Sequence, residues 1–170
     1  MRSSRLRVLV CGLACLAVLA ALSTASAEAK PPKKRAHVVR HPSRRAMLMR
    51  AERRRRHRVI RFAWRAVGVR YRWGGSSLRG FDCSGLTLWV YRHVGVSLPH
   101  YSASQWRFGR RVSRGSLVPG DLLFFSGLGH VGIYVGHGAV IHAPHVGARV
   151  QLTHLRGWLG SSFYGARRIA

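Results

Sequence analysis

The sequence predicts an α+β fold in which N-terminal helices pack on a C-terminal antiparallel β-sheet. Between about residues 60 and 108, apolar residues recur with the period of a helix. From residue 121 onward they alternate with the period of a strand, and Gly-rich turns separate the alternating segments. Helices that precede a run of antiparallel strands are typical of the α+β class.

Three helices and five strands account for most of this compact region. Gly68 stops the first helix and Gly95 ends the second. Residues 136–138 (Gly-His-Gly) predict a tight hairpin turn between two strands. The expected buried face of the first helix comprises Ile60, Ala63, Trp64 and Val67. The expected helices are residues 60–67, 84–94 and 102–108, and the expected strands are residues 121–126, 130–136, 139–143, 149–153 and 163–169.

The first 27 residues have the features of a secretory signal peptide. Three arginines lie within the first seven residues, and residues 8–22 are almost entirely apolar. Ala25-Ser26-Ala27 then provides the small-x-small pattern at which a signal peptidase cuts. We therefore expect export to a periplasm or to the extracellular space, in association with the cell wall.

Loss of the signal peptide leaves one cysteine in the mature chain. Cys11 and Cys15 lie within the signal, and Cys83 lies in the compact region. A single cysteine forms no internal disulfide, and a free thiol is a liability in an oxidising compartment. Its retention is consistent with a chemical role, although a lone cysteine more often serves as a small buried apolar residue.

Cys83 follows a Gly-rich loop and opens a predicted helix. Residues 71–75 (Tyr-Arg-Trp-Gly-Gly) precede it, and the apolar run from Leu86 continues with a helical period. Unpaired backbone N–H groups and the positive end of the helix dipole stabilise a negative charge at this position. The sequence therefore predicts a reactive thiolate, the nucleophilic form of cysteine.

Residues 28–58 form a basic arm that we expect to be largely disordered, before a domain over residues 59–170. Fifteen of the thirty Lys and Arg residues lie between Glu28 and Arg65. A short basic helix around residues 46–56 is an alternative for part of the arm. Three interpretations of its charge are a solvated linker, attraction to anionic envelope polymers or lipids, and nucleic-acid binding. The export signal argues against nucleic acid, so we expect no such partner.

Two histidines on neighbouring strands are candidates for a base and its orienting partner. His130 begins one predicted strand, and His142 lies near the end of the next. A hairpin about residues 136–138 brings these strand ends together, as a base and the group that orients it require. The alternative for each histidine is a solvent-facing strand end. His37 and His41 share a helical spacing, but no carboxylate lies nearby, so we predict no metal and no cofactor.

Five motifs occur in order along the compact region: Tyr71–Gly75, Phe81–Gly85, Pro119–Phe125, His130–Tyr134 and Ile141–Pro144. In these motifs the chain resembles the NlpC/P60 family of papain-like cysteine peptidases, which cut the peptide stems of bacterial peptidoglycan. The resemblance extends from about Val59 to the C-terminus. Five ordered motifs are far more specific than any single one.

The resemblance implies a role for each matching residue. In the family, an arginine usually follows the Leu-Pro pair, whereas this chain has His100 and therefore lacks the side chain to which the family assigns a substrate-carboxylate contact. Arg107 and Arg110 are candidate substitutes. The resemblance implies that Cys83 is the nucleophile, His130 the base and His142 the residue that orients the base. It implies that Tyr71 is an oxyanion donor and Ser102 a substrate-side serine. Asp82 and Ser84 would flank the thiol, and Asp82 would help to hold the stem peptide.

The expected activity is hydrolysis of an amide bond in peptidoglycan stem peptides by a monomeric enzyme that remodels the cell wall. The resemblance implies a thioester acyl-enzyme and, by default, the bond between D-glutamate and a diamino acid. A thiol acyltransferase or amidase that acts on another envelope substrate is the first alternative. A non-catalytic module that binds the envelope is the second.

Overall fold

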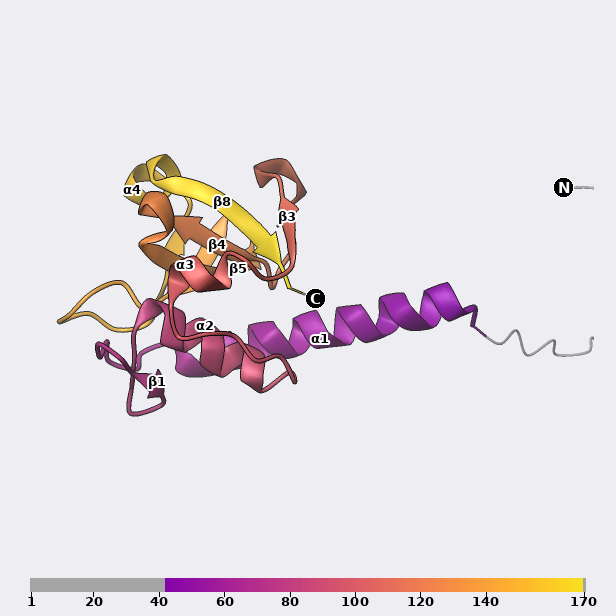
Figure 1. Ribbon diagram of the computed structural model, residues 1–170, viewed down its shortest axis with the longest axis horizontal. Coiled ribbons are helices and arrows are strands. Elements are labelled where there is room, and N and C mark those ends of the chain that lie inside the picture. The colour runs from indigo at the N-terminus through magenta and orange to yellow at the C-terminus, as the bar shows by residue number, and fades with distance from the viewer. Residues whose placement is uncertain (1–41, 170) are drawn as a thin grey trace, which may run out of the picture. The chain divides into compact units, whose positions relative to one another are not determined.

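The computed structural model of the chain describes residues 42–169 (Figure 1). The predicted signal peptide and residues 28–41 of the basic arm lie outside the described residues. The helices are α1 (Arg44–Ala66), α2 (Cys83–Arg92), α3 (Ser102–Gln105) and α4 (Gly157–Ser161), with 3-10 turns η1 (Arg114–Ser116) and η2 (Ser126–Leu128). The strands are β1 (Ser76–Ser77), β2 (Gly80–Phe81), β3 (Arg110–Val112), β4 (Leu122–Phe125), β5 (His130–Gly136), β6 (Ala139–His142), β7 (Gln151–His154) and β8 (Phe163–Arg168).

The α+β prediction is confirmed. Six strands form one antiparallel sheet in the order β3-β8-β4-β5-β6-β7, and β1 and β2 form a separate small hairpin. Each of the five predicted strands has a counterpart in β4 to β8, with ends within two residues of those expected. The sequence did not predict β1, β2, β3 or α4, because such short elements are too brief to show a hydrophobic period.

Apolar side chains fill both sides of the sheet. The larger cluster joins α1 and α2 to the face that carries Leu122, Phe124 and Val131. The smaller cluster covers the other face and includes Leu123 and Phe125. Successive side chains of a strand point to opposite faces, so β4 contributes to both clusters and is buried along its whole length.

Helix α1 begins well before the expected domain boundary at residue 59. Ser43 caps it by accepting a hydrogen bond from the backbone N–H of Ala46 at 3.2 Å. Residues 44–58 are therefore helical and form one continuous element with residues 59–66, in agreement with the basic helix that the sequence offered as the alternative for this part of the arm. None of residues 42–58 is buried.

The predicted buried face of this helix was wrong by one position. The buried residues of α1 are Val59, Phe62, Ala63 and Ala66, whereas Trp64 is 50% exposed. Both sets have the i, i+3, i+4, i+7 spacing, so the period alone does not choose between them. Phe62 decides the matter, because its ring packs edge-on against Trp89 of α2 with 5.9 Å between centroids.

A buried carboxylate fixes the start of β4 to the end of β8. Arg168 donates from Nε and Nη2 to the two oxygens of Asp121, at 2.7 and 2.8 Å. The backbone N–H of Val118 donates to the same carboxylate at 2.8 Å.

Across residues 42–169, no helix combines the length and apolar character needed to cross a bilayer.

Candidate active site

Cys83 is the first residue of α2, and Asp82 caps the helix. The Asp82 Oδ1 atom accepts a hydrogen bond from the backbone N–H of Gly85 at 2.7 Å. A Cβ atom on Gly85 would lie 2.0 Å from the carbonyl oxygen of Gly75, so only glycine permits this contact between loop and helix. The Gly-Gly turn and the helix start therefore hold the half-buried thiol in a fixed place.

The surroundings of Cys83 favour the thiol over the thiolate. Burial raises the pKa of Cys83 most, and the nearby Asp82 charge raises it further. Backbone N–H groups, including that of Val131, lower this pKa, but they do not outweigh the burial. The expectation that the helix start alone yields a thiolate is therefore wrong for the free chain, and a base must remove the proton.

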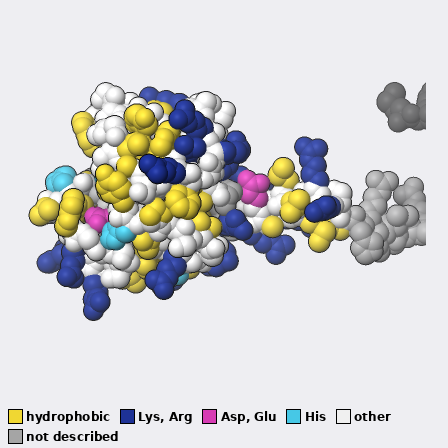
Figure 2. All heavy atoms as spheres, viewed as in Figure 1, with side chains coloured by type: hydrophobic (Ala, Val, Ile, Leu, Met, Phe, Trp, Pro, Cys, Tyr) yellow, Lys and Arg dark blue, Asp and Glu magenta, His cyan; other side chains and the backbone are white. Residues whose placement is uncertain are grey.

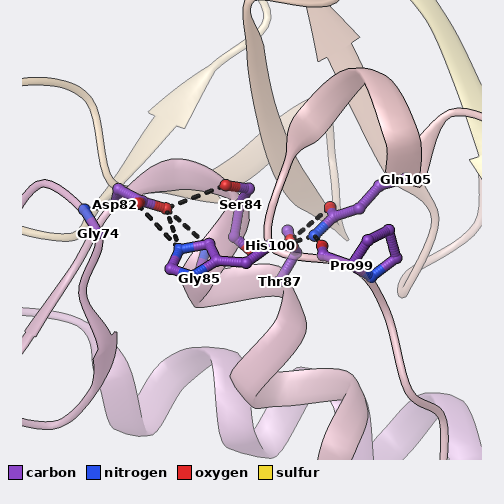
Figure 3. Close-up of polar contacts among 8 residues, drawn as sticks. All are labelled: Gly74, Asp82, Ser84, Gly85, Thr87, Pro99, His100 and Gln105. Atoms are coloured by element: carbon purple, nitrogen blue, oxygen red, sulfur yellow. Dashed lines mark hydrogen bonds and ion pairs between the residues drawn. The ribbon is translucent and has the colours of Figure 1, made fainter.

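The carboxylate of Asp82 accepts four further contacts that join three segments (Figure 3). The backbone N–H of Gly74 donates to Oδ2 at 2.9 Å, and the Ser84 hydroxyl donates to Oδ1 at 3.1 Å. The His100 Nε2 atom lies 3.0 and 2.9 Å from the two oxygens. Asp82 is 8% exposed, so its carboxylate is a buried junction between loop, helix and the His100 segment.

Gln105 holds the segment that delivers His100 to Asp82 (Figure 3). Its Nε2 atom donates to the carbonyl oxygens of Pro99 and Ser84, at 2.7 and 3.0 Å. Its Oε1 atom accepts from the Thr87 hydroxyl at 2.6 Å. Sequence reasoning missed Gln105, because a single polar residue in a four-residue helix gives no signal that it is fully buried.

Ser102 begins α3 and is buried. Its hydroxyl donates to the carbonyl oxygen of Leu128 in η2 at 2.6 Å. In the free chain this hydroxyl therefore joins α3 to the loop before β5. Its expected contact with substrate stays a prediction.

His130 and His142 meet as predicted. His130 Nε2 lies 2.8 Å from His142 Nδ1, and both side chains are buried. The β5–β6 hairpin pairs Ile133 with Ile141, and this register brings the outer strand ends together. His142 Nε2 lies 3.0 Å from the hydroxyl oxygen of Thr153 on β7, a partner that sequence reasoning did not find.

Gly132 of β5 allows a close approach of β6 at the position of His142. A Cβ atom at this position would lie 2.5 Å from Val140 Cγ1 and 3.1 Å from His142 Cβ. Any side chain there would force Val140 and the Cβ atom of His142 away from β5. The glycine therefore allows the close approach of β5 and β6 that positions His142.

Both histidines are neutral at neutral pH. Burial first, and then the charge of His142, lowers the pKa of His130 to about 4. The pKa of His142 is likewise lowered to about 4, first by burial and then by His145. In the tautomer in which His142 Nε2–H donates to Thr153, the Nδ1 atom of His142 accepts a hydrogen bond from His130 Nε2–H. His130 Nδ1 is then an unprotonated acceptor, as a general base requires.

Tyr71 pairs with Phe81, two residues before the nucleophile, in an isolated parallel bridge. Burial raises the pKa of its phenol most, followed by the charges of Cys83 and Asp82, so the hydroxyl stays protonated. Its backbone N–H donates to the carbonyl oxygen of Ala148 at 2.9 Å. For residues 42–169 the structure gives no hydrogen bond between Cys83 and His130. Val131, the residue that follows His130 on β5, lowers the pKa of the Cys83 thiol through its backbone N–H, which places this part of β5 next to the sulfur.

The sequence model of the NlpC/P60 family matches residues 68–168. The chain belongs to the NlpC/P60 family. Over 114 residues it is 41% identical to the Listeria monocytogenes protein named "Probable endopeptidase p60", a match that covers 65% of this chain and 23% of that one. Over 113 residues it is 39% identical to the peptidoglycan endopeptidase RipA of Mycobacterium tuberculosis, covering 58% of this chain and 24% of RipA.

Solved structures give the same family. The crystallised peptidoglycan hydrolase RipB of M. tuberculosis matches with a TM-score of 0.64 and 32% identity, covering 71% of this chain and 67% of RipB. The chain spans about a quarter of the length of the curated relatives p60 and RipA.

Proposed function

We propose that this protein is a cysteine endopeptidase that hydrolyses stem peptides of peptidoglycan. The observation that carries the proposal is the placement of a capped, half-buried Cys83 against β5, whose first residue His130 contacts His142. The names of p60, RipA and RipB support peptidoglycan as the substrate class. The preferred bond is the one between D-glutamate and a diamino acid.

In the proposed reaction, substrate binding brings His130 Nδ1 to the thiol. The imidazole takes the proton, and the sulfur attacks the carbonyl carbon of the stem amide. The oxyanion accepts hydrogen bonds from the Tyr71 phenol and the backbone N–H of Cys83. The imidazolium then protonates the leaving amine, which leaves a thioester, and water hydrolyses the thioester to a carboxylate and the free thiol.

His142 and Thr153 keep the base in its working tautomer. In this proposal a neutral His142 accepts a hydrogen bond from His130 Nε2–H, and the Nδ1 atom of His130 stays free to take the thiol proton. In this design a neutral imidazole orients the base, where a carboxylate serves in other cysteine and serine hydrolases. Asp82 supports the nucleophile from the other side and, as the family resemblance implies, is a candidate contact for the stem peptide.

The test is digestion of purified peptidoglycan by the mature chain from Glu28, beside a Cys83→Ala control, with the released muropeptides resolved by mass. New fragments from the wild type alone are expected, and their masses identify the bond. If neither protein releases fragments in reducing buffer from several wall chemistries, the endopeptidase proposal is overturned. Binding of intact sacculi by both proteins without cleavage would favour an envelope-binding module instead.

We further propose that the chain is exported through its N-terminal signal and that the exposed half of α1 attaches it to an anionic lipid surface. Eight arginines and one glutamate lie in residues 44–58. Met47, Leu48 and Met49 are 54–61% exposed among them, and Figure 2 shows yellow hydrophobic and dark-blue basic side chains together on the exposed half of α1. Exposed apolar side chains beside arginines favour a bilayer over a purely polar wall polymer.

Vesicles containing anionic or only zwitterionic phospholipid provide the test of the lipid attachment. The protein is expected to sediment with the anionic vesicles, and replacement of Met47 and Leu48 by serine is expected to weaken this binding with the charge unchanged. Equal binding by the serine variant, or binding to sacculi but not to vesicles, would assign the arm to anionic wall polymers.

A further inference from the structure

Two arginines face each other across an isolated β-bridge near the nucleophile. Arg70, just after the α1 turn, pairs in antiparallel fashion with Arg149, which precedes β7. Directly opposed residues of an antiparallel pair have Cβ atoms about 4.5–5.5 Å apart, and like charges there repel. The bridge is held by backbone bonds from Val150 to Val69 and from Tyr71 to Ala148, at 2.8 and 2.9 Å. The fold thus holds two positive charges together.

No carboxylate of the described chain neutralises this pair. Within residues 42–169 the acidic residues are Glu52, Asp82 and Asp121, which pair with Arg56, His100 and Arg168. Arg149 Nη1 donates to the carbonyl oxygen of Gly68 at 2.8 Å, which leaves its other donors free. In the same described range, the Arg70 side chain has no hydrogen-bond partner. Both residues are exposed.

The pair lines a cavity that also contains the oxyanion candidate. Arg70, Arg149, Tyr71, Gly147 and Ala148 surround a space of about 360 Å³. Tyr71 pairs with Phe81 in an isolated parallel bridge, and the backbone N–H of Phe81 donates to the carbonyl oxygen of Arg70 at 3.2 Å, so the cavity lies beside the segment that leads into Cys83. An anionic group in this cavity is therefore within reach of a substrate whose scissile carbonyl lies at Cys83.

We propose that Arg70 and Arg149 form a subsite for a free carboxylate of the stem peptide, an inference that rests on the proposed endopeptidase function. A glutamyl residue that is linked through one of its carboxyl groups keeps the other one free, and a diamino diacid also carries a free carboxylate. Guanidinium groups bind carboxylates in a planar, bidentate way. The bound anion relieves the repulsion between the two arginines. The pair thereby supplies the carboxylate contact that the family assigns to an arginine, at whose position this chain has His100.

The experiment compares a synthetic stem peptide that carries both free carboxylates with two variants of it, one with a carboxamide at the glutamyl residue and one with a carboxamide at the diamino acid. Cleavage of each is measured for the wild type, Arg70→Gln, Arg149→Gln and Arg92→Gln. Arg92, at the far end of α2, serves as a control that removes one exposed positive charge elsewhere. Arg70→Gln breaks no side-chain hydrogen bond of the described chain, so it remains informative if Arg149→Gln folds poorly.

The wild type is expected to prefer the carboxylate peptide to one of the two carboxamide variants, chiefly through KM. Arg70→Gln and Arg149→Gln are expected to lower kcat/KM for the carboxylate peptide by about tenfold to a hundredfold, as for a lost charge-assisted hydrogen bond. Cleavage of that carboxamide variant is expected to change less than about threefold. Arg70→Lys, which keeps the charge, is expected to retain part of the preference.

Equal losses on the carboxylate peptide and on that carboxamide variant, or the same loss in Arg92→Gln, would overturn the subsite while leaving the endopeptidase function intact. If the wild type cleaves no peptide, the proposed function fails, and the subsite is then decided by binding. Calorimetry with Cys83→Ala is expected to show tighter binding of the carboxylate peptide than of its carboxamide variants. Equal affinity for all of them would overturn the subsite proposal as well.

Discussion

The nucleophile side and the base side of the site are built in different ways. Cys83 is held by a cap, a Gly-Gly turn and one loop, so its supports lie between Gly74 and Gln105. His130 is held by three adjacent strands, because its partner His142 lies on β6 and Thr153 on β7. Many polar contacts converge on Asp82, whereas the histidines form a single linear chain. Substitutions in the residues that support Cys83 should therefore act mainly on the free energy of unfolding. Substitutions in the histidine chain should act mainly on kcat.

The largest expected effect lies on the base side. His130→Gln keeps a donor toward His142 but offers no base of suitable pKa to the thiol. We expect kcat to fall by about a hundredfold to ten-thousandfold, with an unchanged circular dichroism spectrum. Muropeptide release under substrate saturation measures kcat. Activity within tenfold of the wild type would exclude His130 as the base.

On the nucleophile side, Asp82→Ala should act mainly on stability. The change removes a helix cap and leaves the N–H of Gly85 and Gly74 and the Ser84 hydroxyl without their acceptor. We expect the free energy of unfolding to fall by about 2 kcal/mol or more, as measured by urea titration. Asp82→Asn retains an acceptor oxygen and should lose less. Equal stability of the alanine variant would contradict the junction role.

The pH dependence separates the two sides further. The pKa of both histidines in the folded chain is about 4, below the ordinary value of 6.5. The unfolded chain thus binds more protons, so stability is full above about pH 6.5 and falls as the pH drops toward 4. Thermal unfolding between pH 7 and pH 4 should show this loss, and His142→Gln should reduce it. A melting temperature that rises on acidification would contradict the lowered values.

Thr153→Val is expected to have a moderate effect on chemistry. It removes the acceptor that fixes the tautomer of His142, so the wrong nitrogen of His130 is protonated more often. We expect kcat to fall about tenfold with KM unchanged and with the acid limb of the pH profile shifted, whereas Thr153→Ser should behave as the wild type. A serine variant as slow as the valine variant would assign Thr153 to packing alone.

The smallest expected effect concerns His100. Its side chain is about one third exposed, and Asp82 keeps its other donors without it. His100→Gln retains one donor, and we expect kcat/KM within about threefold of the wild type. His100→Ala should lower the free energy of unfolding by about 1 kcal/mol. A large loss of activity at unchanged stability would instead give His100 a direct role in substrate binding.

The sequence by itself determined the features that depend on neighbouring residues. The change from helical to alternating apolar period predicted the α+β class and the five strands from β4 to β8. The helix start at Cys83 and the hairpin that joins His130 to His142 also follow from short stretches. The NlpC/P60 family of the chain was predicted from five ordered motifs, and the family comparison confirms it.

Only the tertiary structure decided what depends on packing between distant segments. Trp89 selected the buried face of α1, since two faces share the same period. Burial set the protonation of Cys83 and of both histidines, against the effect of the helix start alone. Strand register brought Thr153 to His142 and Arg149 to Arg70, residues that are 11 and 79 positions apart in the chain. Local patterns fix a residue's own element, whereas a site between elements depends on how they pack.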